Sequence, residues 1–125
     1  MRVIRIYADA SGISHLAETR IALAADKLGR ISAPLVPGEG AFLRELRAGL
    51  FVDFHCAPRR QLVIVVEGKV EVEAGDGVRA AASRGEAIFV EDTNGRGHIT
   101  RVGDVAALCV YIPVAAQFDI GAMGG

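Results

Sequence analysis

The stretch that decides the fold runs from residue 49 to residue 68 and reads Gly49-Leu50-Phe51-Val52-Asp53-Phe54-His55-Cys56-Ala57-Pro58-Arg59-Arg60-Gln61-Leu62-Val63-Ile64-Val65-Val66-Glu67-Gly68. Residues an even number apart on a β-strand share a face, so His55 and Gln61 are expected to face one interior from a single strand. Leu62, Ile64 and Val66 alternate with equally apolar neighbours, and a strand that is apolar on both faces is covered on both. The stretch therefore predicts strands buried within a β-sheet protein.

Short strands at regular spacing continue through the rest of the chain. In residues 69–73, valines alternate with charged residues, which is the period of a strand with one face in water. Gly75-Asp76-Gly77 predicts a hairpin turn, because glycine and aspartate tolerate the left-handed backbone of such turns. Further strands are expected over residues 3–7, 87–90, 99–102 and 105–112. Many short strands separated by glycine turns predict a double-sheet barrel or jelly roll.

Composition narrows the class of protein. The chain has 125 residues, enough for one domain with its own core, and 14 basic against 15 acidic residues give a net charge of -1. This balance gives no electrostatic basis for binding nucleic acid. Every apolar run, residues 62–66 among them, is far short of the ~20 residues that span a bilayer. Cys56 and Cys109 match no zinc spacing and are expected as free thiols, and no signal peptide pattern begins the chain. We expect a cytoplasmic protein with no nucleic-acid or membrane partner.

The stretch that decides the fold also resembles the first motif of the cupin family. In that motif a glycine is followed by His-x-His, then by a glutamate and a second glycine. His55 takes the place of the first histidine, and Gly68 that of the closing glycine. Ala57 replaces the second histidine and Gln61 replaces the glutamate. The resemblance therefore implies a cupin whose metal site has been partly dismantled.

A second cupin-like motif follows. Residues 85–90 lie where that motif begins, and His98 takes the place of its histidine, although the spacing is two residues longer and the usual Pro-x-Gly is absent. The intervening string Glu91-Asp92-Thr93-Asn94-Gly95-Arg96-Gly97-His98 resembles one found in a branch of small single-domain cupins of the RmlC-like type. Proteins of that branch also carry a string like residues 57–61, Ala-Pro-Arg-Arg-Gln. The resemblance covers roughly residues 49–112.

The resemblance implies an all-β fold, the cupin double-stranded β-helix or jelly-roll barrel, with a short N-terminal extension. We divide the chain into an N-terminal strand and loop extension packing on the barrel (residues 1–40), the cupin barrel (41–116) and a flexible tail (117–125). Residues 24–28 carry helix propensity within the extension. The tail ends in small residues and glycines, and such termini are often loosely held.

The metal donors of a cupin are histidine nitrogens and a carboxylate oxygen that converge inside the barrel. That set suits iron, manganese, nickel, copper or zinc. This chain retains His55 and His98 and offers Gln61 as a neutral oxygen, so these three form the tentative metal set. Loss of one imidazole and one negative charge weakens the binding of a divalent transition metal. Three alternatives stay open: a bound metal, two neutral histidines acting directly as acid and base, and histidines with a structural role alone.

Two arginines between these residues are candidates for binding an anion. By alternation from His55, Arg59 faces inward and Arg60 outward, unless Pro58 disturbs the phase. An inward arginine binds a carboxylate through two parallel hydrogen bonds. For one of the two we expect instead a structural ion pair with Glu91 or Asp92.

Two functional hypotheses of different class follow. The first is an enzyme acting on a small anionic organic substrate inside the barrel, with His55 and His98 as catalytic residues and Arg59 and Gln61 binding the substrate. The alternative is a non-catalytic ligand-binding or sensory cupin that uses the same cavity without metal. In both, the partner is a small molecule. A homodimer is also expected, because the outer face of residues 62–66 needs a cover.

Overall fold

The structure is a computed structural model that describes residues 1–124, and almost all of its regular structure is β-strand. The larger sheet has six strands, in the spatial order β2 (Ser14–Arg20), β1 (Arg2–Ala8), β10 (Ala87–Val90), β7 (Gln61–Glu67), β12 (Ala107–Pro113) and β5 (Phe42–Leu46). The smaller sheet has four, in the order β6 (Phe51–His55), β11 (His98–Val102), β8 (Lys69–Glu73) and β9 (Arg79–Ser83). A third, two-stranded sheet joins β3 (Ala24–Asp26) and β4 (Gly29–Ile31). Within residues 1–124 no helix is long and apolar enough to cross a membrane.

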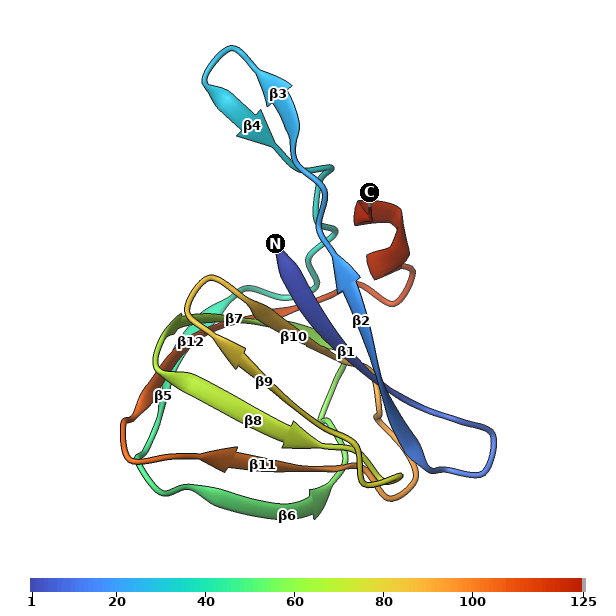
Figure 1. Cartoon of the computed structure of the whole chain (residues 1–125). Helices are drawn as coiled ribbons and strands as arrows, with labels where there is room; N and C mark the ends of the chain where they lie inside the picture. The colour runs from blue at the N-terminus through green and yellow to red at the C-terminus, as the bar shows by residue number, and fades with distance from the viewer. Residues whose placement is uncertain (125) are drawn as a thin grey trace.

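The strand order identifies the fold as a jelly roll. From β5 to β12 the chain passes from one sheet to the other at every connection except the hairpin between β8 and β9. The eight strands form two antiparallel four-stranded layers, β10-β7-β12-β5 and β6-β11-β8-β9, which face each other (Figure 1). This is the double-Greek-key arrangement of a jelly-roll barrel. The predicted all-β jelly-roll barrel is confirmed.

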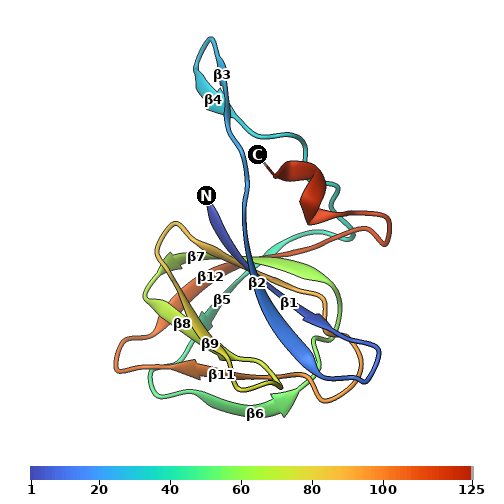
Figure 2. The ribbon, with the colours of Figure 1, turned by 45° about the vertical axis from the view of Figure 1, so that its right-hand side comes forward.

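The N-terminal extension lengthens the larger sheet. Strand β1 pairs in parallel with β10, and β2 pairs antiparallel with β1. Helix propensity over residues 24–28 does not prevail: the segment forms the β3–β4 hairpin, whose turn is fixed by a hydrogen bond from the Leu28 amide to the Asp26 carboxylate at 3.0 Å. An aspartate that bonds the backbone two residues on favours a turn over a helix. The hairpin projects from the barrel with its side chains exposed (Figure 2).

Two hydrophobic clusters lie on opposite faces of the larger sheet. The first fills part of the barrel between the sheets and includes Val63 and Val65 of β7. The second lies on the outer face, where Leu62 and Ile64 pack with buried residues of the C-terminal segment. These residues are Phe118, Ile120 and Met123.

The apolar outer face of β7 is therefore covered by the chain itself at Leu62 and Ile64, whereas Val66 is 38% exposed. The flexible tail expected over residues 117–125 is, as far as residue 124, a packed segment that contains a 3-10 helix, Ile120–Met123. The composition of the segment predicted a loosely held end. Its three large apolar side chains are instead buried against the larger sheet, and removing them from water stabilises the packed position. The homodimer stays a prediction, and two of the three apolar residues from which it was argued, Leu62 and Ile64, have an intramolecular cover.

A histidine links the turn between β1 and β2 to the turn between β8 and β9, and we call this contact the clamp. His15 of β2 lies between two carboxylates: its Nε2 is 2.7 Å from Asp9 Oδ2, and its Nδ1 is 2.9 Å from Asp76 Oδ2. Hydrogen bonds to Asp9 and Asp76 raise the pKa of His15 above its ordinary value of 6.5. The bond to His15 lowers the pKa of Asp9, and a bond from the Val78 amide is the main cause of a lowered pKa at Asp76. The doubly protonated imidazolium is therefore the form that this clamp stabilises.

The clamp predicts a pH dependence of stability. A histidine whose pKa is raised on folding stabilises fully below its unfolded pKa, and this contribution is lost as the pH rises through the folded pKa. The two aspartates, whose pKa values are lowered on folding, stabilise fully above their unfolded pKa, and this contribution is lost as the pH falls. The clamp therefore stabilises the fold fully only between the ordinary pKa values of about 3.8 for Asp and 6.5 for His. We expect His15→Gln to reduce the free energy of unfolding at pH 6 more than at pH 8.5, measured by urea denaturation. An equal loss at both pH values would contradict the clamp, and Asp104→Asn, at an exposed turn, serves as the control.

Candidate functional site

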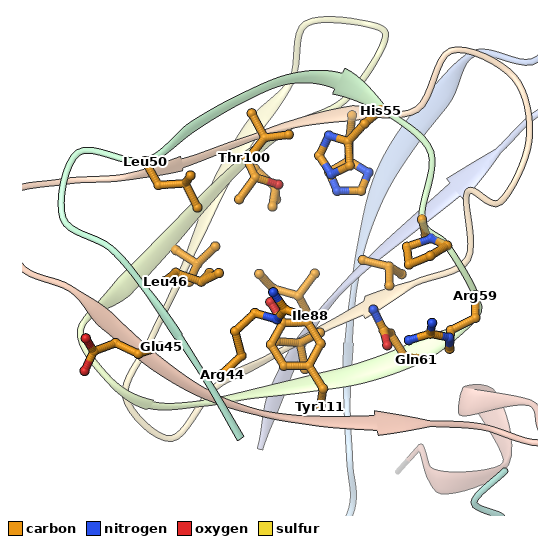
Figure 3. Close-up of a pocket in the computed structure, with 18 of the residues that line it drawn as sticks. Arg44, Glu45, Leu46, Leu50, His55, Arg59, Gln61, Ile88, Thr100 and Tyr111 are labelled. Atoms are coloured by element: carbon orange, nitrogen blue, oxygen red, sulfur yellow. The ribbon is translucent and has the colours of Figure 1, made fainter. Parts of the chain in front are cut away.

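A cavity of about 540 Å³ opens between the two sheets of the barrel. The smaller sheet contributes His55, His98 and Thr100 to its lining, and the larger sheet contributes Gln61 and several apolar residues. In Figure 3 the side chains of His55 and Thr100 face those of Gln61 and Tyr111 across the open space. The polar groups are thus gathered inside the barrel between mainly aliphatic walls.

The two motif histidines are neighbours. His55 at the end of β6 pairs with His98 at the start of β11 in the antiparallel register. Their ring centroids are 4.5 Å apart, with an angle of 52° between the ring planes. A register shift between His98 and Thr100 lets both Val52 and His55 line the cavity, although strict alternation would place them on opposite faces.

His98 forms a buried pair with an aspartate that the sequence analysis did not assign to it. Its Nδ1 lies 2.5 Å from Asp92 Oδ2; the His98 side chain is 5% exposed and that of Asp92 is 0% exposed. The carboxylate accepts a hydrogen bond from Nδ1–H, which leaves Nε2 of the neutral ring as the free nitrogen. Asp92 precedes His98 by six residues in the same glycine-rich string. This short separation was the one feature of the sequence that indicated a pairing of the two side chains.

His55 is oriented by a backbone group. Its Nδ1 lies 2.9 Å from the carbonyl oxygen of Asp53, which can only accept a hydrogen bond. Nδ1 therefore carries the proton in the neutral ring, and Nε2 is again the free nitrogen. Both imidazoles are held by their Nδ1 atoms and keep Nε2 available for a ligand.

Gln61 lies on a different strand from the one predicted. His55 ends β6 and Gln61 begins β7, so the two belong to opposite sheets, and residues 56–60 form the connection between them. The expectation of a single strand is wrong because Pro58 and the crossing between sheets interrupt it. Gln61 still lines the cavity, is only 5% exposed, and its Oε1 has no hydrogen-bond partner among residues 1–124.

The donors gathered here do not fit the usual metal site of a cupin. The described part of the chain contains no group of three histidine, cysteine, aspartate or glutamate side chains placed to hold a metal ion. Ala57 is buried beside the cavity where the motif would supply a second histidine. Two imidazole nitrogens and a neutral amide oxygen fall short of three strong protein donors, the usual number in catalytic zinc sites.

The two adjacent arginines have different roles. Arg60 pairs with Glu91 at 2.9 Å and donates a hydrogen bond to the Phe118 carbonyl at 2.6 Å. Arg5 contacts the same glutamate, so Glu91 lies between two guanidinium groups. Arg59 instead lines the cavity, and Figure 3 shows it beside Gln61. The structural ion pair foreseen for one arginine is that of Arg60 with Glu91.

Two arginines that sequence analysis missed come from β5 and from the residue that follows it. Arg44 and Arg47 line the cavity together with Glu45, and the Arg44 guanidinium lies 5.7 Å from the ring centroid of Tyr111. Burial raises the pKa of Tyr111, an effect that the nearby Arg44 opposes. No sequence motif covers β5. Its contribution to the cavity follows from the place of the strand at the edge of the larger sheet, which only the structure shows.

Both cysteines are free thiols, as expected. Cys109 lies in the core, and burial raises its pKa to about 11. Cys56 is next to His55, but its Sγ contacts the Gly95 carbonyl oxygen at 3.0 Å. Neither thiol lines the cavity, so the chemistry of the cavity rests on imidazole, amide, hydroxyl and guanidinium groups and the carboxylate of Glu45.

The glycine before His98 is required by a close backbone approach. Gly97 has φ of +81°, and a Cβ atom there would overlap the carbonyl group of His55. Gly95 likewise leaves no room for a Cβ atom against the backbone of Gly12. The loop that carries Asp92 and His98 therefore lies directly on β6 and on the first turn of the chain.

No protein-family model matches the chain, and no curated protein matches it. Among solved structures it is similar to NovW, a 4-keto-6-deoxy sugar epimerase from the novobiocin biosynthetic gene cluster of Streptomyces spheroides. That match has 18% identity and a TM-score of 0.45, over 94% of this chain and 71% of the other. It is also similar to a protein named ethanolamine utilization protein Q from Salmonella typhimurium LT2, with 13% identity and a TM-score of 0.41, over 94% and 98% of the two chains. Neither match bears on substrate or reaction, and the fold assignment rests on the strand order.

The contact at Gly97 predicts a large effect of a small substitution. Gly97→Ala places a methyl group against the His55 carbonyl, so His98 has to move away from His55. Gly85→Ala is a matched control, because Gly85 has a φ of +82° but open space around it. We expect Gly97→Ala to lower the free energy of unfolding by at least about 2 kcal/mol more than Gly85→Ala does. Equal losses in urea denaturation would show that the close approach does not constrain the loop.

The missing donors predict how metal binding could be restored. We expect protein purified without chelators to contain far less than one transition metal ion per chain, measured by elemental analysis. The double variant Ala57→His, Gln61→Glu supplies the imidazole and the charge that the cavity lacks, and should take up roughly one zinc ion per chain. One tightly held ion per wild-type chain, lost in both His55→Ala and His98→Ala, would overturn this expectation.

Proposed function

We propose that the protein is a small-molecule-binding cupin, and that it is an enzyme that transfers protons on a small anionic organic substrate without a metal. The observation that carries this proposal is the buried His98–Asp92 pair. A carboxylate that holds Nδ1–H orients the imidazole and stabilises the imidazolium that forms when Nε2 accepts a proton. A histidine with only a structural role would not need a free Nε2 at the wall of an open cavity.

The chemistry assigned to His98 is reversible proton transfer. Nε2 takes a proton from a C–H, N–H or O–H group of the bound molecule, and the positive charge is shared with Asp92 through the Nδ1 hydrogen bond. A proton is then returned to the substrate, at the same or another atom, and when Nε2–H exchanges with solvent first the returned hydron comes from water. The step needs no oxidant or reductant. The adjacent His55, 4.5 Å away between ring centroids, offers a second Nε2 to bind the substrate or to donate a proton.

Charge around the cavity supports an anionic ligand. Arg44, Arg47 and Arg59 line the cavity, and within residues 1–124 none of the three forms a salt bridge with an acidic side chain. Glu45 is the single acidic residue of the lining. Arginine binds carboxylate or phosphate through paired N–H groups. The remaining walls are aliphatic, which suits a short organic body.

Small 2-oxo acids test the proposal, because they combine a carboxylate with a C–H group acidic enough for imidazole. We expect pyruvate, 2-oxobutyrate or 2-oxoglutarate to bind, as followed by saturation-transfer NMR, and to exchange the C–H protons next to the ketone with D₂O faster than in buffer. Asp92→Asn should slow the exchange by roughly two orders of magnitude, and His98→Gln should reduce it to the buffer rate with binding retained. Chelator should have no effect.

The arginine assignment has its own control. Arg59→Gln and Arg44→Gln should each weaken binding of the acid by about tenfold, whereas Arg84→Gln, at an exposed turn, should not change it. Binding without catalysed exchange would favour the non-catalytic, sensory cupin. Absence of binding for every acid, or equal binding by the Arg44→Gln, Arg59→Gln double variant, would contradict the anion site.

A further inference from the structure

We propose that the ligand of this cavity carries a hydroxyl group besides its anionic group, and that Gln61 binds this hydroxyl. The inference rests on the proposed function and names a feature of the substrate. Its starting point is the side-chain amide of Gln61, which lines the cavity, is only 5% exposed, and has its Oε1 without a hydrogen-bond partner among the described residues. Buried polar atoms are almost always paired.

The apolar surroundings of Gln61 make it energetically unfavourable to bury its amide without a hydrogen-bond partner. The same stretch of sheet places Val63, Ile88 and Val90 along the cavity wall, so little nearby can satisfy the group. A leucine of similar size would fill this position without losing hydrogen bonds to water on folding. An amide kept here without a protein partner is explained by a partner that arrives with the ligand.

The chemistry of an amide selects a hydroxyl as that partner. Oε1 accepts a hydrogen bond and Nε2 donates one, and a half-turn of the group exchanges the two atoms. Oε1 is itself buried from solvent, so a ligand contacts it only after this half-turn brings it to the cavity. A hydroxyl both donates and accepts, so it satisfies the amide in either orientation, whereas a ketone or carboxylate oxygen cannot donate to Oε1. An ammonium group would be repelled by Arg59, which lies beside Gln61 in Figure 3.

The position of Gln61 makes its contact with the ligand separate from the contacts of the arginines and the histidines. Arg44 and Gln61 belong to the larger sheet, and the two histidines belong to the smaller one. A ligand held between the sheets meets guanidinium groups with its acid group, Gln61 with its hydroxyl, and the free imidazole nitrogens from the opposite side. Gln61 is therefore a specificity-determining residue that distinguishes a hydroxylated acid from its counterpart without the hydroxyl.

Matched pairs of acids test this inference. The probes are pyruvate with 3-hydroxypyruvate, 2-oxobutyrate with 4-hydroxy-2-oxobutyrate, and 2-oxoglutarate with 4-hydroxy-2-oxoglutarate, titrated by NMR or calorimetry. We expect the wild-type protein to bind at least one hydroxylated acid about tenfold more tightly than its partner. Gln61→Leu should bring that ratio close to one and leave the affinity for the unhydroxylated acid within about twofold. Gln117→Leu, at an exposed position, is the matched control and should leave the ratio unchanged.

The outcomes separate the two proposals. If the acids bind but the hydroxyl makes no difference in the wild-type protein, or if Gln61→Leu keeps the full preference, the assignment to Gln61 is wrong and the anion site stands. If none of the six acids binds, the proposed function fails and this inference fails with it. Unfolding of the variant is excluded by comparing its urea denaturation with that of Gln117→Leu.

Discussion

A fully buried carboxylate is unfavourable unless its charge is compensated, and in this protein the hydrogen bond from His98 compensates Asp92. The pair forms only if the loop between β10 and β11 folds down onto β6. Backbone contacts hold it there: the Ala57 amide donates to the Asp92 carbonyl at 3.0 Å, and Gly97 lies against the His55 carbonyl. The connection between the sheets, the position of His55 and the free nitrogen of His98 all depend on this one buried interaction.

The N-terminal extension supports the same loop from outside. The Arg96 amide donates to the Gly12 carbonyl at 2.9 Å, and the buried Ser14 hydroxyl donates to the Gly97 carbonyl at 2.7 Å. Ser14 Oγ also accepts a hydrogen bond from the Gly75 amide at 2.7 Å, and His15 links the adjacent turns. A segment that lies far from His55 and His98 in sequence therefore determines how firmly the loop with Asp92 is held, and the extension is part of the site's support.

The regular alternation of apolar and polar residues was enough to predict the barrel, because strand period and turn glycines are local properties. The resemblance to the cupin motifs, with alternation from His55, placed His55, His98, Gln61 and Arg59 at one cavity, although Gln61 lies on the opposite sheet from the one implied. Asp92, Arg44 and Arg47 were not assigned, because their roles depend on how a loop folds and on which strand forms the sheet edge. The docked tail was missed for a related reason: three apolar residues among glycines show no period, and only the exposed back of β7 explains their burial.

The position of β12 has a consequence for how the chain acquires its shape. This strand is the last of the barrel strands in sequence, yet it lies between β7 and β5 in the larger sheet and supplies the hydrogen-bonded neighbour of both. During synthesis, β5 has no strand to pair with until residues 107–113 exist, and its unpaired backbone groups and exposed Phe42 and Leu43 stay open to other chains. Assembly of the barrel must wait for a contact between distant parts of the sequence, and until then β5 is a segment prone to aggregate on a ribosome-bound chain.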